Sequence, residues 1–252
     1  MISNLTVLKK MLIIGILALF AFVAIGTIFL FNEKNILISE KKSKLVNIVE
    51  LPYSLVESEY KAFTDGKIDE KTAKENAVNA IKKLRYDKTN YIWINDDTLP
   101  HPKMIMHPIA TSLDGKVLNA EKFNCATDLE YANNEIVKTD GKKNLFQSFV
   151  EVVNKGNTGF VGYLWPKPKA DGTNTEELYE KLSYVKKFDK WGWVIGSGIY
   201  IDDVNAEFNQ SLLNIILTVF FVFIFLELVS YFIVKDIVTK VDLLDSGLVD
   251  FF

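Results

Sequence analysis

Two long runs of apolar residues, one near each end, dominate the pattern of hydrophobic and polar positions along the chain. The first, Met11–Phe31, reads MLIIGILALFAFVAIGTIFLF and contains no charged residue. The second, Leu212–Val234, reads LLNIILTVFFVFIFLELVSYFIV and contains one, Glu227. Each run is long enough to cross a hydrocarbon core of about 30 Å as a helix. The pattern therefore predicts two membrane-spanning helices.

The first run has the flanks of an uncleaved signal anchor. The apolar region of a cleaved signal peptide usually spans about 7–15 residues and ends at a small-residue site, and no such site precedes the polar stretch Asn32–Lys34. Lys9 and Lys10 place the N-terminus in the cytoplasm, and two spans return the C-terminus to that side. We therefore expect a cytoplasmic N-terminus (1–10), a first span (11–31), an outer domain (32–211), a second span (212–234) and a cytoplasmic connector (235–252).

The outer domain begins with helical periodicity. Pro52 predicts a kink or a break in a first helix, whose apolar residues recur at a spacing close to 3.6: Ile36, Leu37, Leu45, Ile48, Val49, Leu55 and Val56. Asp69 is a suitable cap for a second helix, with the stripe Ala73, Ala77, Ala80, Ile81 and Leu84. A long helix leaving the membrane is a natural dimer element, so we expect a homodimer.

The period then changes to two, which is typical of strands. Alternating segments predict about five strands, at Asn90–Asn95, Lys103–His107, Gly159–Trp165, Leu182–Phe188 and Trp191–Tyr200, with a short amphipathic helix at Asn144–Val153. An α+β fold follows, with an antiparallel sheet backed by helices on one face. The linker Val204–Gln210 contains neither Gly nor Pro, so it can continue as helix into the second span.

Composition and motifs exclude several classes of function. A net charge of −3 without a basic cluster gives no support to nucleic-acid binding. The single cysteine, Cys125, allows no intrachain disulfide. We find no GxSxG elbow, no GxxxxGK[ST] loop and no Cys–His pair near a motif, so we expect no catalytic residues, no cofactor and no enzyme.

A metal site is the rival interpretation of one polar cluster. The candidate ligands are Asp96, Asp97, His101 and His107. Zinc needs three or four ligands held at about 2 Å. The chain has only two histidines, which prolines separate on an expected turn, and it has no HExxH-type helix. The sequence therefore favours no metal.

Four segments together resemble a known family. They read YIWINDD, MIMHP, GFVGYLWPKP and KLSYVKKFDKWGWVIGSGIYIDDV, and they are similar to the single Cache domain (sCache_2 type) of bacterial methyl-accepting chemotaxis receptors. The resemblance covers about Asn32–Gln210. It implies a PAS-like fold, recognition of a small organic acid, and signalling through a dimer in the bacterial inner membrane, with the sensor domain in the periplasm.

The end of the chain departs from that family. The segment VDLLDSGLVDFF resembles the connector of HAMP-less receptors from epsilon-type bacteria, where it leads into a signalling domain. No methylation helices and no kinase or cyclase motifs follow Phe252. We expect a truncated chain whose cytoplasmic signalling partners act through a missing C-terminal domain.

A carboxylate pocket in such a domain needs cationic and hydrogen-bonding groups beside apolar walls. The predicted polar set is His107, Tyr163, Tyr184 and Lys186, and the predicted walls are Trp93, Met104, Met106 and Trp165. A histidine before a proline is more often structural, but the resemblance implies that His107 lines the pocket. Lys186 fits a solvated strand position equally well. Trp191, Trp193 and Tyr200 are expected to close the core beneath the pocket.

The sequence thus predicts a transmembrane chemoreceptor sensor for a C2–C4 carboxylate such as acetate, propionate, lactate or pyruvate. The alternatives are the same sensor feeding a histidine kinase or a diguanylate cyclase, and a membrane-anchored periplasmic enzyme. Glu227 fits either a packed helix seam near the inner interface or a polar contact across the dimer.

Overall fold

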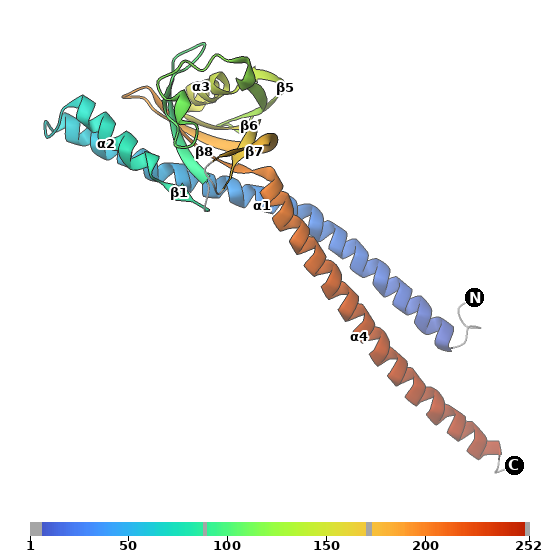
Figure 1. Ribbon diagram of the computed structural model, residues 1–252. Coiled ribbons are helices and arrows are strands. Elements are labelled where there is room, and N and C mark those ends of the chain that lie inside the picture. Colours follow the sequence, from blue (N-terminus) through green and yellow to red (C-terminus); the bar gives the residue numbers. More distant parts are fainter. Residues whose placement is uncertain (1–6, 88–89, 170–172, 250–252) are drawn as a thin grey trace. The chain divides into compact units, whose positions relative to one another are not determined.

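The computed structural model describes residues 7–87, 90–169 and 173–249. Its order is α1 (Val7–Thr64), α2 (Glu70–Lys82), β1 (Arg85–Tyr86), β2 (Asn90–Asp96), β3 (Met104–Met106), η1 (Thr111–Leu113), η2 (Glu121–Phe123), β4 (Asn124–Tyr131), β5 (Ile136–Asn144), α3 (Leu145–Gly156), β6 (Thr158–Pro168), β7 (Asn174–Phe188), β8 (Trp193–Tyr200) and α4 (Ile201–Val249). Figure 1 shows the sheet with its helices. The predicted α+β class is confirmed.

The predicted break at Pro52 is wrong, because α1 continues through it to Thr64. A proline inside a helix costs about 3 kcal/mol. Here the same part of the helix packs on the sheet, where Val49 and Val56 are fully buried and the Tyr53 ring lies 5.7 Å from that of Phe188. Burial of this face opposes the cost of the proline.

The residues that begin the two shorter helices, α2 and α3, are of types favoured at helix N-caps. The Asp69 carboxylate accepts a hydrogen bond from the Thr72 backbone N–H at 2.8 Å and begins α2. The Asn144 side chain accepts from the backbone N–H groups of Phe146 and Gln147, both at 3.0 Å, and begins α3. Both predicted helices are therefore present, with α3 running slightly further than expected.

Within the described residues the sheet has eight strands, all antiparallel to their neighbours, where the sequence predicted about five. The order is β1-β2-β8-β7-β6-β4-β5, and β3 pairs with β2. The unpredicted strands are β1, β4 and β5. In β4 small and acidic residues interrupt the alternation, and β5 is a polar edge strand that is mostly exposed. Neither offers the period of two on which the prediction rested.

Both faces of the sheet are covered. The part of α1 beyond Ile38 lies on one face with α2, where the Tyr60 ring is 5.7 Å from the ring of Trp191. On the other face α3 packs its Phe149 against Trp93, with ring centroids 5.2 Å apart. Because both faces are buried, all residues of β8 are buried as well.

The chain divides into two units. Residues Ile38–Asn205 form a compact unit that contains the whole sheet, and the chain to Leu37 and from Ala206 forms the other. Two helices of the chain, Ile13–Thr64 and Ile201–Val241, contain stretches long and apolar enough to cross a membrane. Within the second unit, the Glu227 carboxylate lies so close to Gly15 that a Cβ at that position would collide with it. This contact agrees with a packed helix seam at Glu227.

Candidate ligand-binding site

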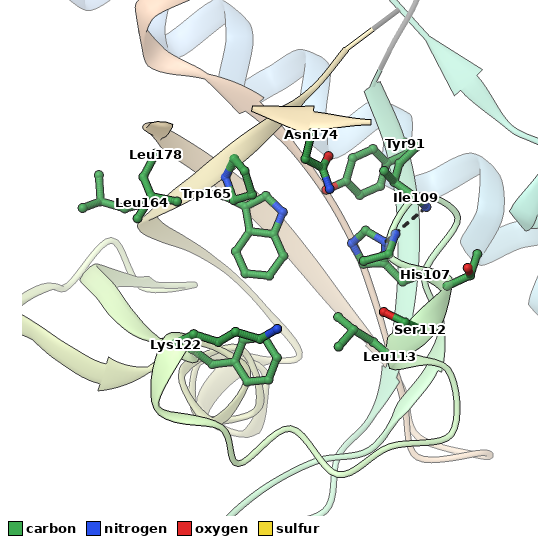
Figure 2. A pocket seen from close by; sticks show the side chains of 14 residues that line it. Tyr91, His107, Ile109, Ser112, Leu113, Lys122, Leu164, Trp165, Asn174 and Leu178 are labelled. Carbon is green, nitrogen blue, oxygen red and sulfur yellow. Dashed lines mark hydrogen bonds between the residues drawn. The ribbon is translucent and has the colours of Figure 1, made fainter. Parts of the chain in front are cut away.

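A cavity of about 570 Å³ opens on the α3 side of the sheet (Figure 2). Its walls come from β2, the loop after β3, η2, and the β6–β7 hairpin. The side chains drawn there include Tyr91, His107, Ile109, Leu113, Phe123, Leu164, Trp165 and Leu178. Behind it is a much smaller void of about 10 Å³, whose lining shares Tyr91, His107 and Trp165 with the cavity and adds Trp93 and Tyr163. These three shared residues form the inner end of the cavity.

His107 is held as a neutral imidazole with a defined tautomer. Its Nδ1 accepts hydrogen bonds from the backbone N–H groups of Ala110 at 2.8 Å and Ile109 at 3.3 Å. Burial, with the charges of Lys181 and Arg85, lowers the pKa of His107 to about 3. An Nδ1 that accepts bonds places the ring proton on Nε2. His107 therefore offers one N–H donor while its other nitrogen fixes the loop that walls the cavity.

Lys181 is the most unusual charge of the site. It is only 3% exposed. Its Nζ donates to the hydroxyl of Tyr91 at 3.1 Å and to that of Tyr200 at 3.4 Å, and it lies over both rings. Among the described residues no carboxylate pairs with it. Burial alone lowers the pKa of this lysine to about 7.

The Tyr91 hydroxyl connects Lys181 to the cavity. Tyr91 lines the cavity together with Trp165. Its ring lies 4.8 Å from that of His107. The second lysine partner, Tyr200, donates its hydroxyl proton to the Pro166 carbonyl at 2.8 Å. The inner end of the cavity thus gathers hydrogen-bond donors backed by one buried cation, which is an arrangement suited to an anion.

The structure brings together only part of the predicted site. His107 and Trp165 line the cavity, and Trp93 and Tyr163 line the void behind it. Met104 and Met106 are fully buried and line neither space. The Tyr163 hydroxyl is bonded to Ser183 at 2.8 Å, which holds the tyrosine against β7.

Tyr184 and Lys186 lie on the other face of the sheet, contrary to their predicted place beside His107. Lys186 forms an ion pair with Glu50 of α1 at 2.7 Å and lies over the ring of Tyr53 at 3.9 Å. The ring of Tyr184 packs on Phe160 at 5.0 Å. Strand parity correctly placed the two on one face. Both faces of β7 carry polar and apolar residues, so parity gave no means of choosing the face that bears the cavity.

Sequence reasoning missed Lys181 and Tyr91. The pairing of β6 with β7 sets Lys181 opposite Tyr163, so the face that carries Tyr163 also carries Lys181 and Ser183. Tyr91 shares its face with Trp93, two residues further along β2. The register of Tyr163 against β7 was therefore the signal that could have identified Lys181 as a site residue.

Two of the rival metal ligands, Asp96 and Asp97, have other roles. Asp96 accepts hydrogen bonds from the backbone N–H groups of Lys103 and Thr98 and so closes a turn. Asp97 pairs with Lys187 at 2.9 Å. Across the part of the chain that the structure describes, no three His, Cys, Asp or Glu side chains are grouped to hold a metal.

Comparisons with known proteins agree on the family. The dCache_2 family, described as a Cache domain, matches residues 23–221; the resemblance found in the sequence was to the sCache_2 type. The chain is 31% identical to the methyl-accepting chemotaxis protein McpP of Pseudomonas putida over 84% of its length. It is 27% identical to the sensor histidine kinase MctS of Rhizobium johnstonii over 69%. It spans about a third of each relative, 34% and 32%.

Solved structures show the same fold. One, described as the periplasmic sensor domain of a chemotaxis protein, is 35% identical and has a TM-score of 0.52, covering 65% of this chain and 97% of that one. Another, described as the structural basis for carboxylic acid recognition by a Cache chemosensory domain, is 29% identical with a TM-score of 0.53, covering 66% and 97%. Each of these chains consists almost entirely of the matched domain. The chain belongs to the Cache domain family, whose members here are sensory regions of chemotaxis receptors and of a sensor kinase.

Proposed function

We propose that this Cache sensor binds a small organic acid, with a C2–C4 carboxylate at the inner end of the cavity. The observation that carries the proposal is Lys181, a buried cation with no carboxylate partner in the described chain. Lysines are almost never fully buried unless they are paired. A carboxylate in the cavity supplies the missing negative charge.

The remaining groups give that carboxylate its hydrogen bonds. The Tyr91 hydroxyl and the Nε2–H of His107 are the donors next to the cavity, and Lys181 stands behind Tyr91 at 3.1 Å. Trp165 and Phe123 form an apolar wall for a short carbon chain, with their rings stacked at 6.3 Å. Charge-assisted hydrogen bonds are about twice as strong as neutral ones. The 29% identical domain described as recognising a carboxylic acid supports the same ligand class.

We propose further that the chain is a receptor of the bacterial inner membrane, with the sensor unit in the periplasm and a homodimer as the signalling state. The two apolar helices, with Lys9 and Lys10 before the first, support this topology. The cytoplasmic signalling partners would be reached through a domain beyond the connector, as in a chemotaxis receptor.

The route from the cavity to α4 is short. Tyr200, which accepts the hydrogen bond of Lys181, directly precedes the first residue of α4. Lys167, two residues after Trp165, bonds to Asp202 at 2.5 Å and Asp203 at 2.8 Å in the first turn of that helix. A ligand that moves Lys181 or Trp165 therefore acts on the start of α4. Helix shifts of about 1–2 Å are a known means of switching.

A thermal-shift screen of residues 32–210 tests the ligand class. An acid at 100 times its Kd should stabilise the domain by about 2.7 kcal/mol. We expect acetate, propionate, lactate or pyruvate to raise the melting temperature, and amines to leave it unchanged. Stabilisation by amines or amino acids alone contradicts the proposal.

The similarity to MctS supports a second candidate for the output domain, a histidine kinase in place of a chemotaxis signalling domain. We favour chemotaxis because the chain is more similar to McpP and over more of its length. The continuation of the reading frame past Phe252 distinguishes them: long heptad helices support the chemotaxis receptor, and a kinase core contradicts it.

A further inference from the structure

The cavity is larger than a C2–C4 acid requires. Its volume of about 570 Å³ falls in the range of about 300–1,000 Å³ that holds drug-sized ligands. A water molecule takes about 30 Å³ of liquid, and acetate has only four heavy atoms. A short acid bound at Tyr91 and His107 therefore leaves most of the cavity to solvent.

The part beyond the inner end carries several apolar side chains, beside the polar Thr111, Ser112, Lys122 and Asn174. Ile109, Leu113 and Phe123 form its sides, and Leu164 and Leu178 of the β6–β7 hairpin stand at its mouth (Figure 2). The two leucines are 37% and 52% exposed, so they contribute little to the core. Leu178 lies opposite Pro166 on the paired strand, and both residues line the cavity. These leucines give apolar contact to whatever enters the cavity.

The cavity thus runs from the donors and the buried Lys181 at the inner end to exposed leucines at the mouth, with Lys122 and Asn174 also in its lining. A ligand that matches this order has a carboxylate followed by an apolar chain. We propose that the outer cavity is a tail subsite and that the domain takes medium-chain monocarboxylic acids such as hexanoate and octanoate, with the carboxylate innermost. The inference rests on the proposed function and extends it from short acids to longer ones.

Calorimetric titration of residues 32–210 with acetate, butyrate, hexanoate and octanoate tests the subsite. The domain is suitable because the sheet lies wholly within the compact unit Ile38–Asn205, and a relative of similar extent has been solved by itself. Each buried methylene contributes about 0.8 kcal/mol, which corresponds to about fourfold in affinity. We expect hexanoate to bind at least tenfold more tightly than butyrate. Equal or weaker binding of hexanoate overturns the inference.

A pair of exposed-residue variants separates the tail from the carboxylate. Leu178→Asn should weaken hexanoate binding several-fold more than acetate binding, because only the longer chain reaches the mouth. Ile136→Asn is the matched control, since Ile136 is 57% exposed on β5 and lines neither space. Hexanoate binding that is the same in both variants overturns the tail subsite. Absence of binding by every acid overturns the proposed function itself, so the two failures are distinguishable.

Discussion

At the scale of single residues, two lysines on opposite faces of β7 make a matched test. Lys181 is buried beside Tyr91, and Lys186 pairs with Glu50 on the helix side. We expect Lys181→Met to reduce acid affinity at least 100-fold, since it removes the charge behind the donors. Lys186→Met should leave affinity unchanged and cost less than about 1 kcal/mol of stability, because Glu50 is partly exposed. Calorimetry and thermal unfolding measure both, and loss of binding in Lys186→Met alone would contradict our placement.

Acid binding should depend on pH through Lys181, whose pKa burial lowers to about 7. A bound carboxylate favours the protonated lysine, so affinity is highest where the free domain already carries that proton. We expect the Kd to be constant between about pH 5.5 and 6.5. Well above pH 7 the Kd should rise by up to about tenfold per pH unit. Calorimetry across this range checks it, and a flat profile to pH 9 would argue against a role for Lys181.

The same lysine should make the free domain more stable as pH rises. The unfolded chain holds its lysine proton up to about pH 10.4, whereas the folded domain releases it near pH 7. The unfolded state then binds more protons, so stability increases by up to about 1.4 kcal/mol per unit in this window. Urea unfolding of wild type and Lys181→Met at pH 7 and 9 isolates the contribution of this lysine. An equal change in the free energy of unfolding between the two pH values in both proteins would exclude it.

His107 has two roles that two substitutions separate. Its Nδ1 accepts from Ala110 and Ile109, while Nε2 faces the ligand in our proposal. Asparagine keeps an acceptor near Nδ1 but has nothing at Nε2. His107→Asn should therefore lose binding and keep most of its stability, whereas His107→Ala should lose both, with a cost of about 1–3 kcal/mol for the unpaired N–H groups. Full binding by His107→Asn would show that His107 only anchors the loop.

At the scale of elements, the sequence predicted what periodicity can show. Strands β2, β3, β6, β7 and β8, with α3, were found where residues alternate or form an amphipathic stripe. Strands β4 and β5 were not, since long-range pairing with β6 holds β4 in the sheet and pairing with β4 holds β5, rather than a local pattern of alternation. The same limit explains the site: parity grouped Tyr184 with Lys186, but only the full sheet shows that α1 covers them.

The contact between Lys167 and the start of α4 predicts how the signal leaves the sensor. Inserting two glycines after Asn205 should uncouple binding from output without changing affinity, because it makes a continuous helix flexible. Lys167→Ala should weaken the coupling in the same way, since it frees Asp202 and Asp203. The readout is a chimera of this chain with a known chemoreceptor signalling domain. Normal output from both variants, with binding intact, would contradict the stiff connection.

At the scale of the whole molecule, one compact sensor unit is bounded by two helices suited to a membrane. The family and the fold follow from a small set of segments, most of them in β2, β6, β7 and β8. The proposed anion site depends on three-dimensional register instead, because Lys181, Tyr91 and His107 come from different parts of the chain. For this reason two of these three residues, Lys181 and Tyr91, could not be taken from the sequence.

The position of the carboxylate in a crystal structure of the acid-bound domain tests our central claim most directly. Residues 32–210 would be crystallised with the acid that gives the largest thermal shift. We predict the carboxylate at the inner end of the cavity, within hydrogen-bonding distance of the Tyr91 hydroxyl and His107 Nε2, with Lys181 beside it. A carboxylate bound on the helix side, next to Lys186 and Tyr184, would contradict the account.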